Sequence, residues 1–173
     1  DIAVFTNLSP NHPDVHTTME EYAQAKENIF SHQGPGDLAI FNQDNDLTRA
    51  MAERAPGRVM KFSRRSALEE GTYVEHGMIY VAHNGQKRTL FSTDRILIPG
   101  QHNVENYLAA IAAVQGMVSD EVILHTAETF PGVEHRIELV RTKDGVRYYN
   151  DSIASSPTRT IAGLRSFHQK VII

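Results

Sequence analysis

The sequence contains no cysteine, no apolar run of membrane-spanning length and no block of like charge. Without cysteine there is no disulfide and no thiolate metal site, a composition compatible with the cytosol. A membrane-spanning helix needs roughly 20 apolar residues in succession, and no run approaches that length. The net charge of −4 comes without a basic stripe, so we expect neither a nucleic acid nor a membrane as partner.

The chain does contain enough apolar material for a packed core. Of its 173 residues, 40% are hydrophobic, 8% aromatic and 22% charged. This length is typical of one domain or two small ones. The nine histidines exclude nothing, because histidine serves as metal ligand, base or surface residue.

Both ends of the chain have the pattern of interrupted strands. The sequence opens on an apolar, β-branched run at residues 2–7, with no initiator methionine or leader before it. It stops at residues 170–173 (KVII), where a strand is just beginning. We therefore expect an internal piece of a longer protein.

The first third of the chain predicts an α/β fold with a mostly parallel sheet. Strands are expected at residues 2–7, 38–41 and 59–62, and helices at 17–30 and 47–54. Thr17 or Thr18 can cap the first helix, with Glu20 or Glu21 three residues later in capping-box spacing. Such alternation of strands and helices is typical of a doubly wound sheet.

Antiparallel hairpins and two helices are expected next. Residues 72–98 alternate as hairpin strands do, and Asn84-Gly85 is a turn signal. After Pro99-Gly100, an alanine-rich helix is expected to about residue 114, and a second one over 120–130.

Pro131-Gly132 predicts a boundary between domains at 1–131 and 132–173. Beyond it, the turn signal Asp144-Gly145 lies between two strand-like runs. Ser156-Pro157 then provides a cap and a first-turn proline for a helix from residue 158 to about 167. That helix leads into the final strand-like run.

A polar loop after the first strand is the first candidate for chemistry. Ligands of open α/β sheets bind beyond the carboxyl ends of the strands, where His12 and Asp14 are expected. His12 could ligate a divalent metal, and Asp14 could orient it or hold a metal-bound water. The alternative is a polar turn closed by an Asx-type hydrogen bond.

Lys26 is the second candidate, because helical spacing places it on an apolar stripe with Met19, Tyr22, Ala23 and Ile29. A lysine there either extends its ammonium group to solvent or has a function. Partial desolvation favours the neutral amine, which can capture carbon dioxide as a carbamate. A carbamate is a carboxylate on a long arm, suited to Mg²⁺.

Asn103 and Asn106 are the third candidate, sharing one face of the first turn of the alanine-rich helix. Their amides offer both donors and acceptors, as an adenine edge requires. The alternative is that one of them caps the helix.

The order and spacing of these features resemble the Mur ligase family over almost the whole chain. The four stretches that carry the resemblance are 6–16 (TNLSPNHPDVH) with Lys26 downstream, 100–106 (GQHNVEN), 130–138 (FPGVEHRIE) and 149–152 (YNDS). The last of them is similar to the D-glutamate-adding branch, because the other branches usually carry a different aspartate motif there.

The resemblance implies an α/β, P-loop-NTPase-like central domain over 1–131 and the start of a Rossmann-like domain over 132–173. It implies a bacterial, cytoplasmic, ATP- and Mg²⁺-dependent ligase of peptidoglycan precursor synthesis, which joins D-glutamate to UDP-N-acetylmuramoyl-L-alanine through an acyl phosphate.

Six site residues follow from the same resemblance. His12 and Lys26 are implied as catalytic and Mg²⁺-holding residues, with Lys26 carbamylated. Asn103 and Asn106 would contact adenine. Arg136 would contact the phosphates of the nucleotide, and Asp151 its ribose, completing the site by domain closure.

Two departures from the family pattern stand out. Ile153 and Ser155 occupy places where the family usually has lysine and threonine, and Ile153 cannot bind an anion. The family's phosphate-binding loop, of the G-x-x-x-x-G-K-[ST] kind, has no counterpart in the chain. We therefore expect the chain alone to be inactive and to self-associate through exposed strand edges.

Two alternative functions stay open. One is another Mur ligase or a folylpolyglutamate synthetase, against which residues 149–152 argue. The other is a non-catalytic binding domain with a ligase-like fold.

Overall fold

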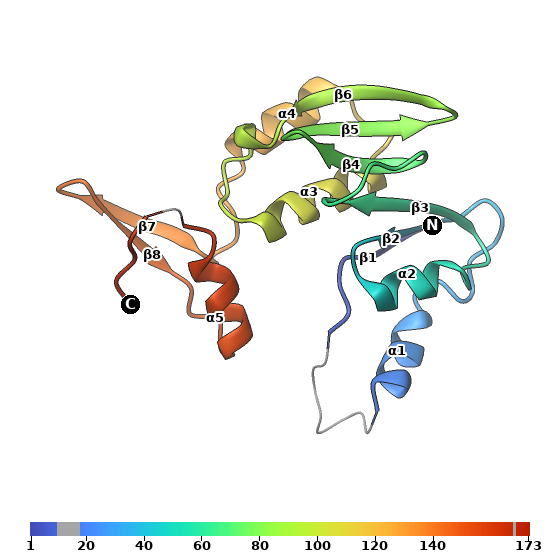
Figure 1. The fold of residues 1–173 in the computed structure, drawn as a ribbon, viewed down its shortest axis with the longest axis horizontal. Helices are drawn as coiled ribbons and strands as arrows, with labels where there is room; N and C mark the ends of the chain where they lie inside the picture. The colour runs from blue at the N-terminus through green and yellow to red at the C-terminus, as the bar shows by residue number, and fades with distance from the viewer. Residues whose placement is uncertain (10–17, 168) are drawn as a thin grey trace.

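The computed structural model describes residues 1–9, 18–167 and 169–173. It contains a six-stranded sheet with the order β1-β2-β3-β4-β5-β6 and a separate two-stranded sheet, β7-β8. The small sheet and the helix that follows it lie apart from the large sheet (Figure 1). Within the described ranges, no helix is both long and apolar enough to cross a bilayer.

The large sheet is parallel in its first part and antiparallel in its second. Its strands are β1 (Ile2–Phe5), β2 (Leu38–Asn42), β3 (Arg58–Ser63), β4 (Gly71–Glu75), β5 (Met78–His83) and β6 (Gln86–Ser92). β1 to β4 pair in parallel, whereas β4-β5 and β5-β6 pair antiparallel. Asn84 and Gly85 turn between β5 and β6 with φ of 52° and 73°. The expected mostly parallel α/β sheet with a hairpin region is confirmed.

Helices cover both faces of this sheet, as the alternation of strands and helices predicts. They are α1 (Met19–Glu27), α2 (Asp46–Ala52), the short 3-10 helix η1 (Thr93–Arg95), α3 (Gln101–Ala113) and α4 (Asp120–Thr129). Ile40 packs with Leu108 of α3 in one apolar cluster. Its neighbour Phe41 packs with Met51 and Phe30 in another cluster on the opposite face. The core therefore has two layers, which fix α3 against the sheet.

Helix α1 has the predicted cap, and its apolar stripe packs partly against the core. The Thr18 hydroxyl accepts a hydrogen bond from the Glu21 backbone N–H at 3.2 Å. No residue of α1 is buried, Lys26 is exposed, and Ile29 is 59% exposed. Met19, Tyr22 and Ala23 of the expected apolar stripe are partly buried and pack against the core, together with the buried Phe30 beyond the helix end. The exposure of Lys26 agrees with the alternative in which its ammonium group extends to solvent.

Glycine is required at position 71, where β4 begins to pair with β3. Its φ of +127° lies in a region that side-chain-bearing residues rarely adopt. A Cβ atom built there would lie 1.9 Å from the Lys61 carbonyl oxygen. The close backbone approach that lets β4 join the sheet thus depends on glycine.

The small unit consists of β7 (Glu138–Lys143), β8 (Val146–Asn150) and α5 (Pro157–Leu164). The turn at Asp144-Gly145 and the cap at Ser156-Pro157 form as predicted. The final strand expected at residues 170–173 was wrong. Residues 171–173 have no regular structure, and no described strand pairs with them. Ile172 and Ile173 are therefore almost fully exposed.

Candidate functional site

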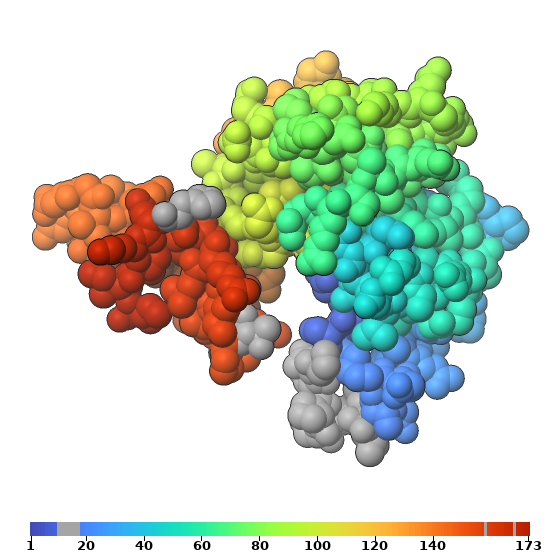
Figure 2. Space-filling model, viewed as in Figure 1, coloured from blue at the N-terminus to red at the C-terminus, as the bar shows by residue number. Residues whose placement is uncertain are grey.

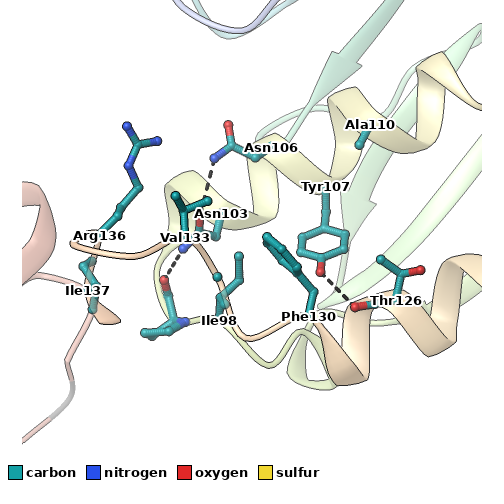
Figure 3. Close-up of a pocket in the computed structure, with 12 residues that line it drawn as sticks. Ile98, Asn103, Asn106, Tyr107, Ala110, Thr126, Phe130, Val133, Arg136 and Ile137 are labelled. Carbon is teal, nitrogen blue, oxygen red and sulfur yellow. Dashed lines mark hydrogen bonds between the residues drawn. The ribbon is translucent and has the colours of Figure 1, made fainter. Parts of the chain in front are cut away.

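The first turn of α3 borders a cavity of about 310 Å³. The opposite wall is formed by residues 130–137, which connect α4 to the small unit (Figure 3). α3 begins after Gly100, whose φ of +106° turns the chain into the helix without a side-chain cap. This turn directs the first face of α3 toward the connecting residues.

Asn103 and Asn106 form one hydrogen-bonded unit at this cavity. The buried Asn103 donates from Nδ2 to the Pro99 carbonyl oxygen at 2.6 Å. Its Oδ1 accepts from Asn106 Nδ2 at 3.3 Å. Asn106 is exposed, and its own Oδ1 has no partner among the described residues (Figure 3). Asn103 thus holds the helix start, while Asn106 offers an acceptor to a ligand.

The rest of this cavity is mostly apolar. Its wall includes Ile98, Tyr107, Phe130 and Val133, whose side chains surround the hollow in Figure 3. The Tyr107 hydroxyl donates to the Thr126 carbonyl oxygen at 3.2 Å, and burial raises the pKa of Tyr107. The Tyr107 oxygen is thereby held against α4, so the ring presents apolar surface. The shape and chemistry suit a flat heterocycle with a polar edge.

A second cavity of about 370 Å³ adjoins the first and shares Asn106, Arg136 and Ile137 with it. It lies between α3 and α5, where the molecular surface is hollowed (Figure 2). Asp151 lines this cavity, and its Oδ1 accepts from the Ile137 backbone N–H at 3.1 Å. Arg159 of α5 also lines it. Polar and charged groups are therefore collected beside the apolar cavity.

His102 of α3 lies in this second cavity, about half buried. Burial lowers the pKa of His102 most strongly. Glu105 raises it, Arg136 lowers it further, and Asp151 raises it. The imidazole is therefore biased toward its neutral form, which can both donate and accept a hydrogen bond.

Four of the six predicted site residues are brought together, although they lie up to 48 positions apart in the sequence. Asn103, Asn106 and Arg136 line the first cavity, and Asp151 joins Asn106 and Arg136 in the second. Lys26 lies elsewhere, in a shallow groove with Asn7 and Tyr22, its Nζ 5.6 Å from the Tyr22 ring centroid. His12 and Asp14 lie outside the described residues.

The described residues do not form a metal site by themselves. No group of three or more His, Asp or Glu side chains within residues 1–9, 18–167 and 169–173 is arranged to hold a metal ion. The Mg²⁺ predicted at His12 and Lys26 therefore has no geometric support in the described part of the chain.

Three polar residues of the site were not singled out from the sequence. Asn7 follows β1 and lines both the second cavity and the Lys26 groove, so it links the two. Its place at the carboxyl end of a parallel strand was a usable signal. His102 stood inside a quoted motif, whereas nothing in the sequence pattern singled out Arg159.

Comparison with known proteins gives the family. The sequence profile of the Mur ligase middle domain matches residues 1–114. The chain belongs to the Mur ligase family. Two curated Mur ligases match its full length, from Clostridium beijerinckii with 52% identity and from Acetivibrio thermocellus with 54%. Both bear the name UDP-N-acetylmuramoylalanine--D-glutamate ligase, and the chain spans 37% of the length of each.

Solved structures of other Mur ligases share the fold. MurF from Acinetobacter baumannii matches 98% of the chain with a TM-score of 0.72 and 22% identity, over 38% of its own length. The UDP-N-acetylmuramate-alanine ligase MurC from Thermotoga maritima matches 95% with a TM-score of 0.64 and 20% identity, over 37% of its own length. At these identities the likeness establishes the Mur ligase fold alone.

Proposed function

We propose that the chain is part of an ATP-dependent ligase that adds D-glutamate to UDP-N-acetylmuramoyl-L-alanine in bacterial peptidoglycan precursor synthesis. The observation that carries the proposal is the identity of 52–54% over the full chain to two relatives named for that activity. The two solved Mur ligases compared above, MurF and MurC, share only 22% and 20% identity with the chain. The difference favours the D-glutamate-adding branch over another Mur ligase.

The two adjoining cavities support ATP as the nucleotide. Adenine fits the apolar first cavity, where the free Asn106 Oδ1 can accept from the exocyclic amine. Asp151 in the second cavity can accept from ribose hydroxyls, and the exposed Arg136 can donate to phosphate oxygens. The assignment uses residues from both sides of residue 131, so residues 1–131 would be the ATP-binding domain and 132–173 the start of the next domain.

In the proposed reaction, the γ-phosphoryl group passes from ATP to the substrate carboxylate, forming an acyl phosphate and ADP. The amine of D-glutamate attacks the acyl carbon, and phosphate leaves as the amide forms. The described residues contribute nucleotide binding and orientation, which reduce the entropic part of the barrier. Mg²⁺, its binding by His12 and the carbamylation of Lys26 stay predictions from the family resemblance.

The proposal is tested with the intact protein that contains this chain. Phosphate release is measured with ATP, Mg²⁺ and UDP-N-acetylmuramoyl-L-alanine, while the added amino acid is varied. We expect release with D-glutamate, and none with L-glutamate or with dihydrofolate plus L-glutamate. Release only with a different Mur substrate pair would assign another branch. ATP binding without any turnover would favour the non-catalytic alternative.

A further inference from the structure

The second cavity contains one positive charge, that of Arg159, that the proposed nucleotide contacts do not use. Arg136 and Arg159 both line it, one from the connecting residues and one from α5. Asp151 is the only acidic side chain among the described lining residues, and its Oδ1 is already bonded to the Ile137 N–H. The local balance of formal charge is therefore positive.

Neither arginine is neutralised by a residue that the structure describes. No hydrogen bond or ion pair joins the Arg136 or Arg159 guanidinium to any described residue. Of the ten other arginines, half form an ion pair with a described residue, among them Arg64 with Glu105, Arg88 with Asp120 and Arg95 with Glu128. Two guanidinium groups that line one hollow without a described partner keep their N–H donors available to a bound anion.

We propose that Arg159 is an anion-binding residue that acts with Arg136 on a phosphate or carboxylate group of a bound ligand. A guanidinium offers several N–H donors in a planar fork, which matches either oxyanion. Ile153 and Ala162 border the same cavity and supply no charge, so Arg159 is the cation of α5 that reaches it. The proposal rests on the proposed function for the identity of the ligands, but not for the site itself.

The test uses the intact protein and the variants Arg159→Ala, Arg159→Lys and Arg165→Ala. Arg165 directly follows α5, is exposed and lines neither cavity, so it is a matched control for loss of one positive charge. We expect Arg159→Ala to raise the KM of an anionic substrate by about tenfold or more, because a hydrogen bond to a charged group is lost. Arg159→Lys keeps the positive charge but lacks the planar guanidinium fork, so its KM should lie between those of the wild type and Arg159→Ala.

Three titrations distinguish the possible sources of the anion. A rise in the KM for ATP alone places a nucleotide phosphate at Arg159, and a rise for D-glutamate or for the UDP-linked substrate alone places the carboxylate or phosphate of that substrate there. Equal KM values for Arg159→Ala and Arg165→Ala with all three substrates would overturn the inference.

Thermal unfolding separates ligand binding from a structural role. Because Arg159 has no partner among residues 1–9, 18–167 and 169–173, Arg159→Ala should leave Tm unchanged without ligand. A clear fall in Tm would instead show that the residue supports the fold. If the wild-type protein shows no ligation, the proposed function fails, and calorimetric titration with ATP and with inorganic pyrophosphate still tests the anion site. Identical affinities of wild type and Arg159→Ala for both probes would overturn it.

Discussion

The two neighbouring asparagines of α3 have different contacts and therefore different expected roles. Replacing the buried Asn103 by alanine removes the bond to the Pro99 carbonyl oxygen and leaves that oxygen without its partner. We expect Asn103→Ala to cost about 1–3 kcal/mol of unfolding free energy, measured by urea denaturation. Asn106→Ala should change stability by less than about 0.5 kcal/mol.

For ATP affinity, we expect the substitution of Asn106 to have the larger effect of the two. In the intact protein, Asn106→Ala should weaken ATP binding by about 1–3 kcal/mol, measured by calorimetric titration, because the adenine amine loses its acceptor. Binding of the UDP-linked substrate should not change. A loss of ATP affinity only in Asn103→Ala, together with lower stability, would mean that the pair serves the helix start alone.

Substitution of Lys26 tests the prediction that this residue is carbamylated. In the intact protein, Lys26→Ala should abolish D-glutamate ligation, and a short-chain carboxylate should restore part of it by occupying the place of the carbamate. Because Lys26 is exposed and its side chain contacts the Tyr22 ring alone among the interactions of the described residues, Tm should hardly change. Undiminished ligation by the alanine variant would contradict the assignment.

His102 predicts a dependence of stability on pH. Burial lowers the pKa of His102 in the folded chain below the ordinary value near 6.5. Between the ordinary pKa and the lower folded-state pKa the unfolded chain binds more protons, so the unfolding free energy falls as the pH decreases from about 6.5 to the folded-state pKa. The loss is complete below the folded-state pKa.

His102→Gln should reduce the difference in urea stability between pH 7.5 and pH 5.5. The exposed His125 of α4 provides a control, and His125→Gln should leave the wild-type difference in place. An equal difference in all three proteins would exclude His102 as the source.

At the scale of elements, the β3-β4 junction depends on one glycine. Gly71→Ala forces a methyl group against the Lys61 carbonyl oxygen and should cost about 3 kcal/mol or more, seen as lost soluble yield or a much lower Tm. Gly77 also has positive φ, at 75°, but a Cβ there meets nothing within 4 Å. Gly77→Ala should therefore cost only about 1 kcal/mol. Similar stability losses at both positions would mean that the positive φ, and not the contact with the Lys61 carbonyl oxygen, determines the loss at Gly71.

Element identity was largely predictable, because it depends on local chemistry. Apolar runs predicted β1 to β3, and Asn84-Gly85 and Asp144-Gly145 predicted the β5-β6 and β7-β8 turns, since each pair adopts positive φ. The turn between β4 and β5, at His76 and Gly77, was not predicted. The strand expected at residues 170–173 failed, because a strand needs a partner that its own residues cannot reveal. For Lys26, helical spacing left open whether the ammonium group extends to solvent, and the structure shows the residue exposed.

The candidate site was only partly predictable for a related reason. Asn106 and Asp151 were found through motifs, but their meeting depends on how residues 130–137 place the small unit against α3. Arg159 carries no local signal, and only the common cavity links it with Arg136.

For the whole molecule, we expect the purified 173-residue chain to release no phosphate from ATP, with or without both substrates. The sequence has no phosphate-binding loop to hold the β- and γ-phosphates, and the described residues offer no metal cluster to replace it. A coupled phosphate-release assay checks this. Substrate-dependent release would show that the catalytic groups lie within the chain.

The same chain should self-associate. Among the described strands, β1 pairs only with β2 and leaves one edge open. The hairpin β7-β8 also exposes apolar side chains, with Val140 61% and Val146 54% exposed. Light scattering should show a mass that rises with concentration. Val140→Lys should reduce that rise if the hairpin is the contact, and a constant monomer mass for the unmodified chain would refute the expectation.

The connection formed by residues 130–137 determines how closely the binding groups of α3 and of the small unit are held together. Asn106 is attached on one side of it, and Asp151 and Arg159 on the other, yet all three line one cavity. The connection therefore fixes the effective concentration at which the second group meets a ligand already held by the first. Lengthening it with glycine and serine would lower nucleotide affinity while every contacting residue stays in place.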